Sequence, residues 1–258
     1  MQQILENMEK ISKAQVKFVR SLQQKKFRDE SGLFVAEGDK CVEELRKGFE
    51  LVHLYREGEN ATRTEIEQIS GLRTPQGTIG VFKKRSTEHR IQNTDQITLA
   101  LDGIQDPGNL GTIIRTADWF GVRTIVCSLD TADCYNPKVV QATMGALARV
   151  QVHYVDLPKW LNDQINDQMV NIFGTLLDGR DMYDVVSRSR GLDVSTTIIV
   201  MGNEGNGISP AVRQLVTHPI RIPSYPKNAE TSESLNVAIA TAVVLAEFRR
   251  IAQDISLS

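Results

Sequence analysis

The chain has 258 residues, of which 41% are hydrophobic and 24% are charged, and its formal net charge is −2 at pH 7. This is the composition of an ordinary globular protein with one or two domains. The most apolar stretch, residues 237–248, is too short to span a bilayer, and the chain opens without a basic and then apolar leader. We therefore expect neither a membrane-spanning helix nor a signal peptide.

The cysteines and histidines are scattered along the chain. The three cysteines include no pair with C-x-x-C spacing, and the four histidines are isolated from one another. Structural metal sites usually need such residues at short, regular spacing. We expect a reduced, cytoplasmic protein without a metal site.

A basic segment lies near the amino terminus. Its seven cations have no acidic residue among them: Lys10, Lys13, Lys17, Arg20, Lys25, Lys26 and Arg28. An unopposed basic face can bind nucleic-acid phosphates. The alternative is a solvated amphipathic helix whose apolar side chains Ile11, Phe18 and Leu22 face inward. On charge alone, both interpretations stay open.

The rest of the first ninety residues alternates between apolar strands and short helices. The expected strands are residues 33–38, 50–58 and 77–84, and the expected helices are 40–48 and 64–71. A hydrophilic tract without a hydrophobic period follows at 83–95, and we expect it to be a linker. The sequence thus predicts a small α/β domain over residues 1–90.

From Ile97 onward, apolar strands alternate regularly with helices. The expected strands are residues 97–103, 124–129, 151–156, 171–179, 196–203 and 218–223. The expected helices are 113–121, 137–149, 158–167, 210–216 and 232–253. This alternation predicts a second domain, residues 91–258, with a mostly parallel sheet covered on both faces. Ligands of such sheets bind at the carboxyl ends of the strands.

Three loops at predicted strand ends carry unusual residues: 102–115, 201–207 and 222–236. The second loop has glycines with the spacing G-x-x-G-x-G. A dinucleotide fingerprint needs G-x-G-x-x-G and a carboxylate about twenty residues later, and a phosphate loop needs a Gly-Lys-Ser/Thr ending. Neither requirement is met, which disfavours a nucleotide-dependent enzyme of the doubly wound type.

Taken together, the three loops resemble the motifs of the SpoU (TrmH-like) RNA ribose methyltransferases, a branch of the SPOUT class. The similar segments are LDGIQDPGNLGTIIRTADWFG (101–121), IIVMGNEGNGIS (198–209), and IRIP (220–223) with SESLNVAIATAVVL (232–245). Residues 25–45 resemble the small RNA-binding domain that many members carry ahead of the catalytic domain. The resemblance therefore spans the whole chain.

The resemblance implies an α/β fold in which a SPOUT-type, trefoil-knotted parallel-sheet catalytic domain follows a small α/β RNA-binding domain. It implies S-adenosyl-L-methionine as the cofactor, ribosomal or transfer RNA as the partner, and a homodimer. Gly202, Ile222 and Leu235 would line the adenosine, and the turn that ends at Gly207 would let the backbone approach it. Between Pro223 and Ser234 the chain departs from the family, whose loop is several residues shorter and contains glycine.

The catalytic residues implied by the resemblance are Asn109, Arg115, Glu204, Ser234 and Asn236. The reaction moves a methyl group that the cofactor has already activated, so the protein mainly positions the ribose 2′-hydroxyl and helps to remove its proton. The family analogy points to Arg115 as the base, but a free guanidinium is protonated at pH 7. Its other possible role is a charged donor to a phosphate and to the developing alkoxide.

The other candidates would orient groups. Asn109 and Asn236 can each donate and accept hydrogen bonds. Ser234 could bond the hydroxyl or the cofactor, and Glu204 could hold Arg115 or a loop amide. Each candidate also has a structural interpretation, such as Ser234 (or Ser232) capping the closing helix, or Asn109 serving only as a turn residue.

Two other expectations concern metal and assembly. Asp102 and Asp106 follow a strand, where aspartates commonly cap turns, so we expect no metal between them. The closing helix is apolar nearly all round, which favours burial at a symmetric interface. With the resemblance, this predicts a dimer in which Arg115 reaches the partner's cofactor pocket. The alternative function is a non-catalytic RNA-binding or ribosome-assembly factor on the same fold, which would not need the five catalytic candidates.

Overall fold

The computed structural model describes residues 11–85, 91, 97–167, 170–188, 196–226, 232 and 234–256. The chain divides into two compact units: Met1–Glu88 with Asp133–Arg149, and His89–Ala132 with Val150–Ser258. The chain therefore passes between the units three times. The sequence-based division at residue 90 placed the segment 133–149 in the second domain, whereas in the structure it packs with the first unit.

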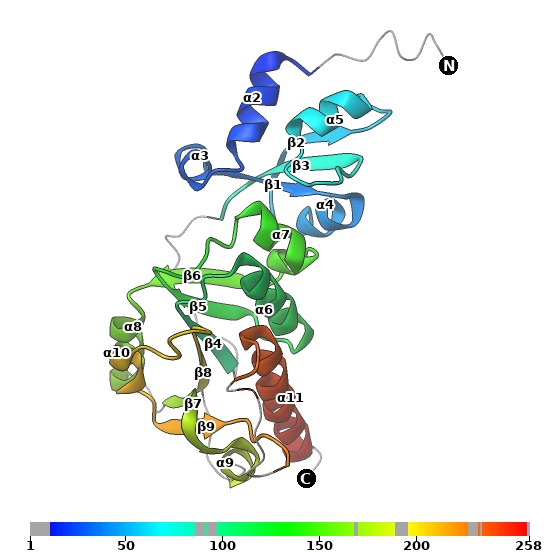
Figure 1. Cartoon of the computed structure of the whole chain (residues 1–258). Coiled ribbons are helices and arrows are strands. Elements are labelled where there is room, and N and C mark those ends of the chain that lie inside the picture. The colour runs from blue at the N-terminus through cyan, green and yellow to red at the C-terminus, as the bar shows by residue number, and fades with distance from the viewer. Residues whose placement is uncertain are drawn as a thin grey trace. The chain divides into compact units, whose positions relative to one another are not determined.

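The first unit contains a three-stranded antiparallel sheet in the order β1-β3-β2 (Figure 1). The strands are β1 (Leu33–Glu37), β2 (Leu51–Arg56) and β3 (Thr78–Lys83). The helices before residue 85 are α2 (Lys13–Ser21), α3 (Lys25–Ser31), α4 (Asp39–Leu45) and α5 (Arg63–Ile69). Helices α2 and α5 pack together over one apolar core, which includes Val19, Leu22 and Ile66.

Segment 133–149 completes a second apolar cluster of this unit. The ring of Tyr135 lies 4.8 Å from that of Phe34 and 6.2 Å from that of Phe49, between ring centres. Burial raises the pKa of the Tyr135 hydroxyl. An ion pair of 2.8 Å joins Arg149 to Glu44 at the end of the segment. The first unit is therefore built from two distant parts of the chain.

The segment also departs from its predicted secondary structure. One helix was expected over 137–149, but α7 (Pro137–Thr143) is followed by a short 3-10 helix, η1 (Ala146–Ala148). Met144 and Gly145 between them have φ values of 51° and 89°. This left-handed backbone ends the α-helix, and a Cβ at Gly145 would overlap the side chain of Glu44.

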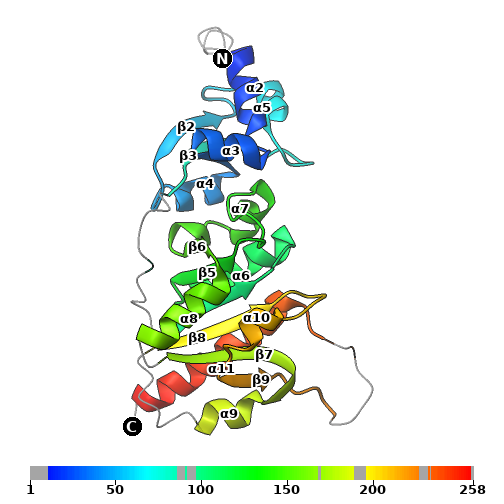
Figure 2. The ribbon, with the colours of Figure 1, turned by 90° about the vertical axis from the view of Figure 1, so that its left-hand side faces the viewer.

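The second unit is a six-stranded parallel sheet in the order β6-β5-β4-β8-β7-β9. Its strands are β4 (Ile97–Asp102), β5 (Thr124–Ser128), β6 (Gln151–Val155), β7 (Val170–Asp181), β8 (Thr196–Gly202) and β9 (His218–Arg221). Its helices are α6 (Pro107–Trp119), α8 (Leu157–Asp167), α9 (Met182–Arg188), α10 (Pro210–Arg213) and α11 (Val237–Ser256). Helices α8 and α10 cover one face, and α6, α9 and α11 cover the other (Figures 1 and 2).

This arrangement confirms the predicted α/β fold with its parallel, two-sided sheet. Part of the loop before α11, residues 227–231 and 233, lies outside the described residues, and the trefoil knot stays a prediction. Among the residues that the structure describes, no helix is long and apolar enough to cross a membrane.

The strand order creates a switch point between β4 and β8. The connection after β4 runs through α6 to β5 on one side, whereas the connection after β8 runs through α10 to β9 on the other. Loops that leave neighbouring strand ends in opposite directions open a crevice between them, and ligands of open α/β sheets bind there. The first two predicted motifs lie at this crevice.

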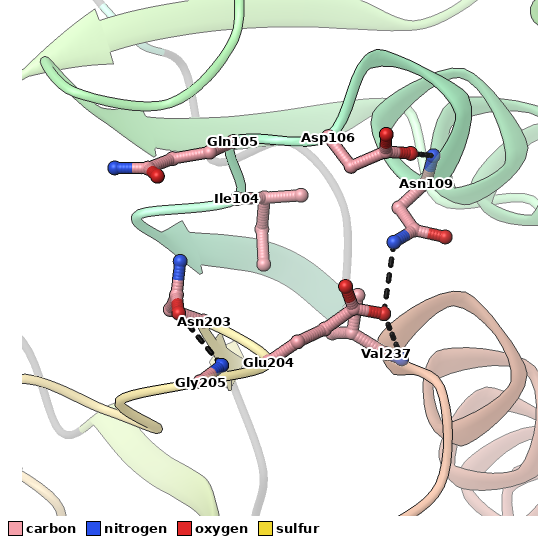
Figure 3. A pocket seen from close by; sticks show the side chains of 8 residues that line it. All are labelled: Ile104, Gln105, Asp106, Asn109, Asn203, Glu204, Gly205 and Val237. Carbon is pink, nitrogen blue, oxygen red and sulfur yellow. Dashed lines mark hydrogen bonds between the residues drawn. The ribbon is translucent and has the colours of Figure 1, made fainter.

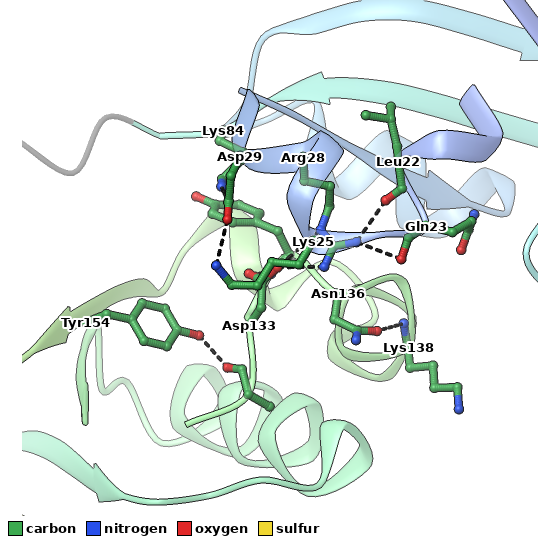
Figure 4. Close-up of polar contacts among 12 residues, drawn as sticks. Leu22, Gln23, Lys25, Arg28, Asp29, Lys84, Asp133, Asn136, Lys138 and Tyr154 are labelled. Carbon is green, nitrogen blue, oxygen red and sulfur yellow. Dashed lines mark hydrogen bonds and ion pairs between the residues drawn. The ribbon is translucent and has the colours of Figure 1, made fainter. Parts of the chain in front are cut away.

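The basic segment is only partly a surface. Arg28 is 1% exposed, and its Nη2 and Nε donate to Oδ2 of Asp133 at 2.7 and 3.1 Å (Figure 4). Its Nη1 donates to the backbone carbonyls of Leu22 and Gln23 at 2.8 and 2.9 Å. The charge of Arg28 is therefore neutralised inside the first unit and is not presented on its surface.

The basic segment is amphipathic as expected, and of the three residues expected to face inward, Ile11 and Leu22 pack against the core whereas Phe18 does not. Val16, Val19 and Leu22, spaced three residues apart, face the core, while Phe18 is 38% exposed. Phe18 is therefore the one residue of the expected inward face that the structure leaves at the surface. Lys13 and Lys17 are exposed on the same helix, and Lys10 lies outside the described residues.

We predict that Arg28→Ala destabilises the first unit by about 3–5 kcal/mol, because the carboxylate of Asp133 would stay buried without its partner. Lys25→Ala is the control, since Lys25 makes an exposed ion pair with Asp29, and such pairs contribute at most about 1 kcal/mol. Urea unfolding with amide hydrogen exchange in β1 and β3 measures the difference. Equal stability of the two variants would contradict the structural role of Arg28.

Candidate functional site

Glu204 is the centre of a hydrogen-bond network at the switch point. Its Oε1 accepts from Nδ2 of Asn109 at 2.8 Å and from the amide of Val237 at 3.4 Å (Figure 3). It also accepts from Nδ2 of Asn236 at 2.7 Å. Nδ2 of Asn236 also lies 2.9 Å from Oδ1 of Asn109. One residue from each of the three predicted motifs therefore meets the other two.

The two asparagines are held by the helices that they begin. Asp106 caps α6 by accepting from the amide of Asn109 at 2.8 Å, and Pro107 occupies the first helical position. At α11, Oδ1 of Asn236 accepts from the amides of Ala238 and Ile239 at 3.0 and 3.2 Å. Asn236 therefore caps the closing helix, whereas the structural interpretation of the sequence had assigned this role to Ser234 or Ser232.

Glu204 is presented by a tight turn after β8. The backbones of Asn203 and Gly207 exchange hydrogen bonds of 3.0 and 2.8 Å, and Gly207 has a φ of 67°. A Cβ at Gly202 would overlap the backbone of Gly207 and Ile208. Glycine at 202 is therefore required by the turn itself, whatever ligand approaches it.

Asn109 and Glu204 line a pocket of about 240 Å³. Its lining residues are Ile104, Gln105, Asp106, Asn109, Asn203, Glu204, Gly205 and Val237 (Figure 3). Pockets for drug-sized ligands usually measure roughly 300–1,000 Å³, so this one suits a smaller group. Ile104 and Gln105 were not predicted as site residues, although their place directly after a buried strand was an available signal.

Arg115 lies on α6 but away from this pocket. Residues six apart on an α-helix point in directions about 120° apart, and Asn109 is the one that faces Glu204. The side chain of Arg115 is exposed, and within the described part of the chain no ion pair involves it. The structure therefore separates Arg115 from the network of its own chain.

The remaining predicted residues lie in the loops after β8 and β9. Gly202 and Ile222 are half-buried, and Gly207 is exposed. Ser234 and Leu235, directly before Asn236, are exposed as well. β8 and β9 are parallel strands that β7 separates in the sheet, and none of these residues lines the pocket at Glu204.

The two strand-end aspartates have structural partners. Oδ2 of Asp102 accepts from the amide of Ser209 at 2.7 Å, and Asp106 caps α6. Within the described ranges, no group of three or more His, Cys, Asp or Glu side chains could hold a metal ion.

The cations of the first unit differ in their partners. Lys25 pairs with Asp29 at 2.6 Å and Lys26 with Glu30 at 3.9 Å. The hydrogen bond that Lys25 donates to Asp29 raises the pKa of Lys25. Three exposed cations of the basic segment have no ion pair among the described residues: Lys13, Lys17 and Arg20.

Known proteins match both units. Residues 96–246 match the SpoU rRNA Methylase family, and residues 13–67 match the MRM3-like substrate binding domain. The chain is 28% identical to the 23S rRNA (guanosine(2553)-2′-O)-methyltransferase RlmP of Bacillus subtilis, over 95% of this chain and 100% of that protein.

Two solved structures are similar over nearly the whole chain. One is an RNA methyltransferase of the TrmH family from Porphyromonas gingivalis, with 36% identity, a TM-score of 0.82 and coverage of 93% of this chain and 98% of that one. The other is an rRNA methyltransferase from Sinorhizobium meliloti bound to AdoMet, with 30% identity, a TM-score of 0.78 and coverage of 94% and 97%.

We predict that Gly202→Ala destabilises the second unit by about 1–3 kcal/mol, the usual cost of forcing an extra methyl group into a packed site. Gly205→Ala is the matched control, because a Cβ there would meet only Oδ1 of Asn203, at 3.4 Å. Thermal unfolding without any ligand measures both variants. If the Gly202 variant melted at the same temperature as the Gly205 variant, the steric explanation would be wrong.

Proposed function

The chain belongs to the SpoU rRNA methylase family, and from this premise we propose that it transfers a methyl group from S-adenosyl-L-methionine to a ribose 2′-hydroxyl of RNA. The observation that carries the proposal is the meeting of Asn109, Glu204 and Asn236 at one carboxylate oxygen. Three loops far apart in the sequence supply these side chains, at the crevice where an α/β sheet binds its ligands.

The loops after β8 and β9 suit the cofactor. The turn at 202–207 presents exposed backbone without side chains at two glycines, and Ile222 and Leu235 add apolar surface in the loop after β9. We propose that Gly202, Gly207, Ile222 and Leu235 line the adenosine. When bound, the cofactor supplies a methyl group activated by its sulfonium.

The pocket at Glu204 is the proposed place of the target ribose. Its volume of about 240 Å³ is small, and its lining is polar at Asn109 and Glu204. Glu204 uses Oε1 to orient the amide groups of Asn109 and Asn236. This leaves Oε2 of Glu204 and the second N–H of Asn109 for the hydroxyl, whereas both N–H groups of Asn236 are already engaged. Ser234 stays a candidate for bonding the hydroxyl or the cofactor. Holding the oxygen in line with the methyl group is the main contribution expected of the protein.

The RNA is proposed to be ribosomal or transfer RNA, with 23S rRNA tested first because the Bacillus subtilis relative acts on it. A cytoplasmic location is also proposed. Cys41, Cys127 and Cys134 are all buried, and none of them forms a disulfide, which suits a reducing compartment.

The assay for the proposal is transfer of labelled methyl groups to 23S rRNA, 16S rRNA and tRNA, followed by mapping of ribose methylation. Methylation of a 2′-hydroxyl in any of them supports the proposal. Binding of RNA without transfer to any of the three, in the presence of bound cofactor, would favour the non-catalytic alternative.

We predict that Glu204→Ala lowers kcat by about 100-fold, since displacement of a positioned group by about 1 Å can cost that much. Its effect on stability should stay small, because truncation of an exposed loop side chain usually changes stability by less than about 0.5 kcal/mol. Glu67→Ala, which removes an exposed glutamate of the first unit, is the control. A Glu204 variant with wild-type turnover would remove the network from the mechanism.

Lys13, Lys17 and Arg20 are the proposed phosphate contacts of the first unit, together with Lys10 and the partly paired Lys25 and Lys26. Each phosphate contact contributes roughly 0.7–0.9 to the slope of log affinity against log salt. We predict that replacing the first three by Ala weakens RNA binding and lowers this slope by about 2, while cofactor affinity stays unchanged.

The control for this prediction replaces Arg46, Lys47 and Arg63 by Ala, which changes the net charge equally. All three are engaged in ion pairs on the same unit. If both triple variants lost the same affinity and slope, the effect would come from overall charge and not from a binding face.

We propose that the protein is a homodimer in which Arg115 acts on the partner's site. Arg115 points away from its own pocket, and Trp119, one turn further along α6, is 84% exposed. An exposed tryptophan beside an arginine is typical of the centre of a protein interface. Because surface guanidinium groups are permanent cations, we assign Arg115 to holding a phosphate or the developing alkoxide.

We predict that an Arg115→Ala chain and an Asn236→Ala chain, each inactive alone, restore activity when mixed. After random exchange, half of the dimers are mixed, and one of the two sites in each mixed dimer is intact. About a quarter of wild-type activity should therefore return. Absence of recovery despite verified subunit exchange would place Arg115 in the site of its own chain.

A further inference from the structure

Asn203, which precedes Glu204, has a side chain that bonds in two directions. Its Oδ1 accepts from the amides of Gly205 and Asn206 at 2.8 and 3.1 Å, which holds the turn closed. Its Nδ2 donates to the carbonyl of Gly103 at 2.6 Å, directly after β4. One side chain therefore both shapes the turn and attaches it to the neighbouring strand end.

The carbonyl that Asn203 binds is itself held in place. Gly103 has a φ of 71°, and its amide donates to Oγ of Ser128 at 2.8 Å, at the end of β5. Ser128 donates in turn to Oδ1 of Asp130 at 2.6 Å. A Cβ at Gly103 would lie 3.3 Å from Oδ2 of Asp130 and 3.7 Å from Cβ of Asn203. The ends of β4, β5 and β8 thus form one connected polar layer beneath the turn.

The turn has a second attachment to β4. Oδ2 of Asp102 accepts from the amide of Ser209, just beyond the turn. The turn is therefore fixed to adjacent residues of β4 at its beginning and after its end. Only the section between these points, which contains Glu204, projects into the pocket.

From these contacts we propose that Asn203 is a positioning residue for the methyl transfer, acting through Glu204. The hydrogen bond from Nδ2 of Asn203 to the carbonyl of Gly103 fixes the turn relative to α6, which begins shortly after Gly103 and carries Asn109. Without this hydrogen bond, the turn can shift. Oε1 of Glu204 then moves beyond hydrogen-bonding distance of Nδ2 of Asn109 or of Asn236. This inference rests on the proposed function for its catalytic part only.

The test is a double-mutant cycle in the full-length protein with Asn203→Ala and Glu204→Ala. If Asn203 acts through Glu204, Asn203→Ala lowers kcat about tenfold or more, as misplaced groups do. The double variant is then no slower than Glu204→Ala alone, because coupled residues are not additive. Multiplied losses of the two single variants would overturn the proposal.

Asn203→Asp separates the two bonds. It keeps the acceptor for the amides of Gly205 and Asn206 but loses the donor to Gly103. We expect it to lower kcat as Asn203→Ala does, with a melting temperature closer to wild type, and it carries the cycle if the Ala variant does not fold. Asn162→Ala is the control, because it truncates an exposed asparagine of α8, outside the proposed site. A wild-type kcat in Asn203→Asp would show that the hydrogen bond from Asn203 to Gly103 does not position Glu204.

A readout without catalysis distinguishes this inference from the proposed function. The amide of Val237, at the first position of α11, donates to Oε1 of Glu204, so its hydrogen exchange reports where that carboxylate lies. We expect exchange at Val237 to accelerate in Asn203→Ala as much as in Glu204→Ala. An unchanged rate of hydrogen exchange at the amide of Val237 would contradict the inference, even if the methyl transfer itself were demonstrated.

Discussion

One carboxylate oxygen joins three separate segments of this chain. Oε1 of Glu204 receives hydrogen bonds from the beginning of α6, from the beginning of α11 and from the side chain that caps α11. The amino ends of both helices therefore lie beside one negative charge, and helix amino ends carry a partial positive charge that favours this placement. The same interaction that caps the closing helix thus assembles the site.

The topology of the sheet explains why this happens between β4 and β8. Their connections leave in opposite directions, so the loops diverge above two strands that remain hydrogen-bonded to each other from Ile97 to Asp102. The diverging loops can carry variable residues without disturbing the buried ladder. A site at this point combines a rigid base with loops that are free to present side chains, which is what precise positioning requires.

Much of this could be predicted from sequence, because its signals are local. Apolar periodicity predicted the parallel sheet and the small first domain, and glycine spacing marked the turn before Glu204. The partners of a side chain are different, since they depend on contacts across the chain. Arg28 resembled the other cations in its segment, and only its pairing with Asp133, 105 residues later, places it in the interior.

The same limit applies to the site. Asn203 lies inside the glycine-rich turn that the sequence marked, yet its side chain bonds the carbonyl of Gly103, 100 residues away. Every residue has a backbone carbonyl, so the sequence does not indicate which one accepts such a bond. Gly202 was expected only as a cofactor contact, and the need of the turn for glycine at this position, where a Cβ would overlap the backbone of Gly207 and Ile208, was not predicted. The break after Thr143 was missed because Met144 is an ordinary helix former, yet it takes a left-handed conformation directly before Gly145.

The division of the first unit between two parts of the chain also affects how it can form during synthesis. When residue 85 has been made, Phe34 and Phe49 still lack the ring of Tyr135, and Arg28 lacks the carboxylate of Asp133. The missing segment ends at Arg149, and translation at roughly 5–20 residues per second needs about 3–13 s to reach it. During this interval the amino-terminal part of the chain has an incomplete core, and Arg28 lacks its carboxylate partner. Strands β4 and β5 emerge in the same interval, so the two units must grow together on the ribosome, one unable to finish before the other has begun.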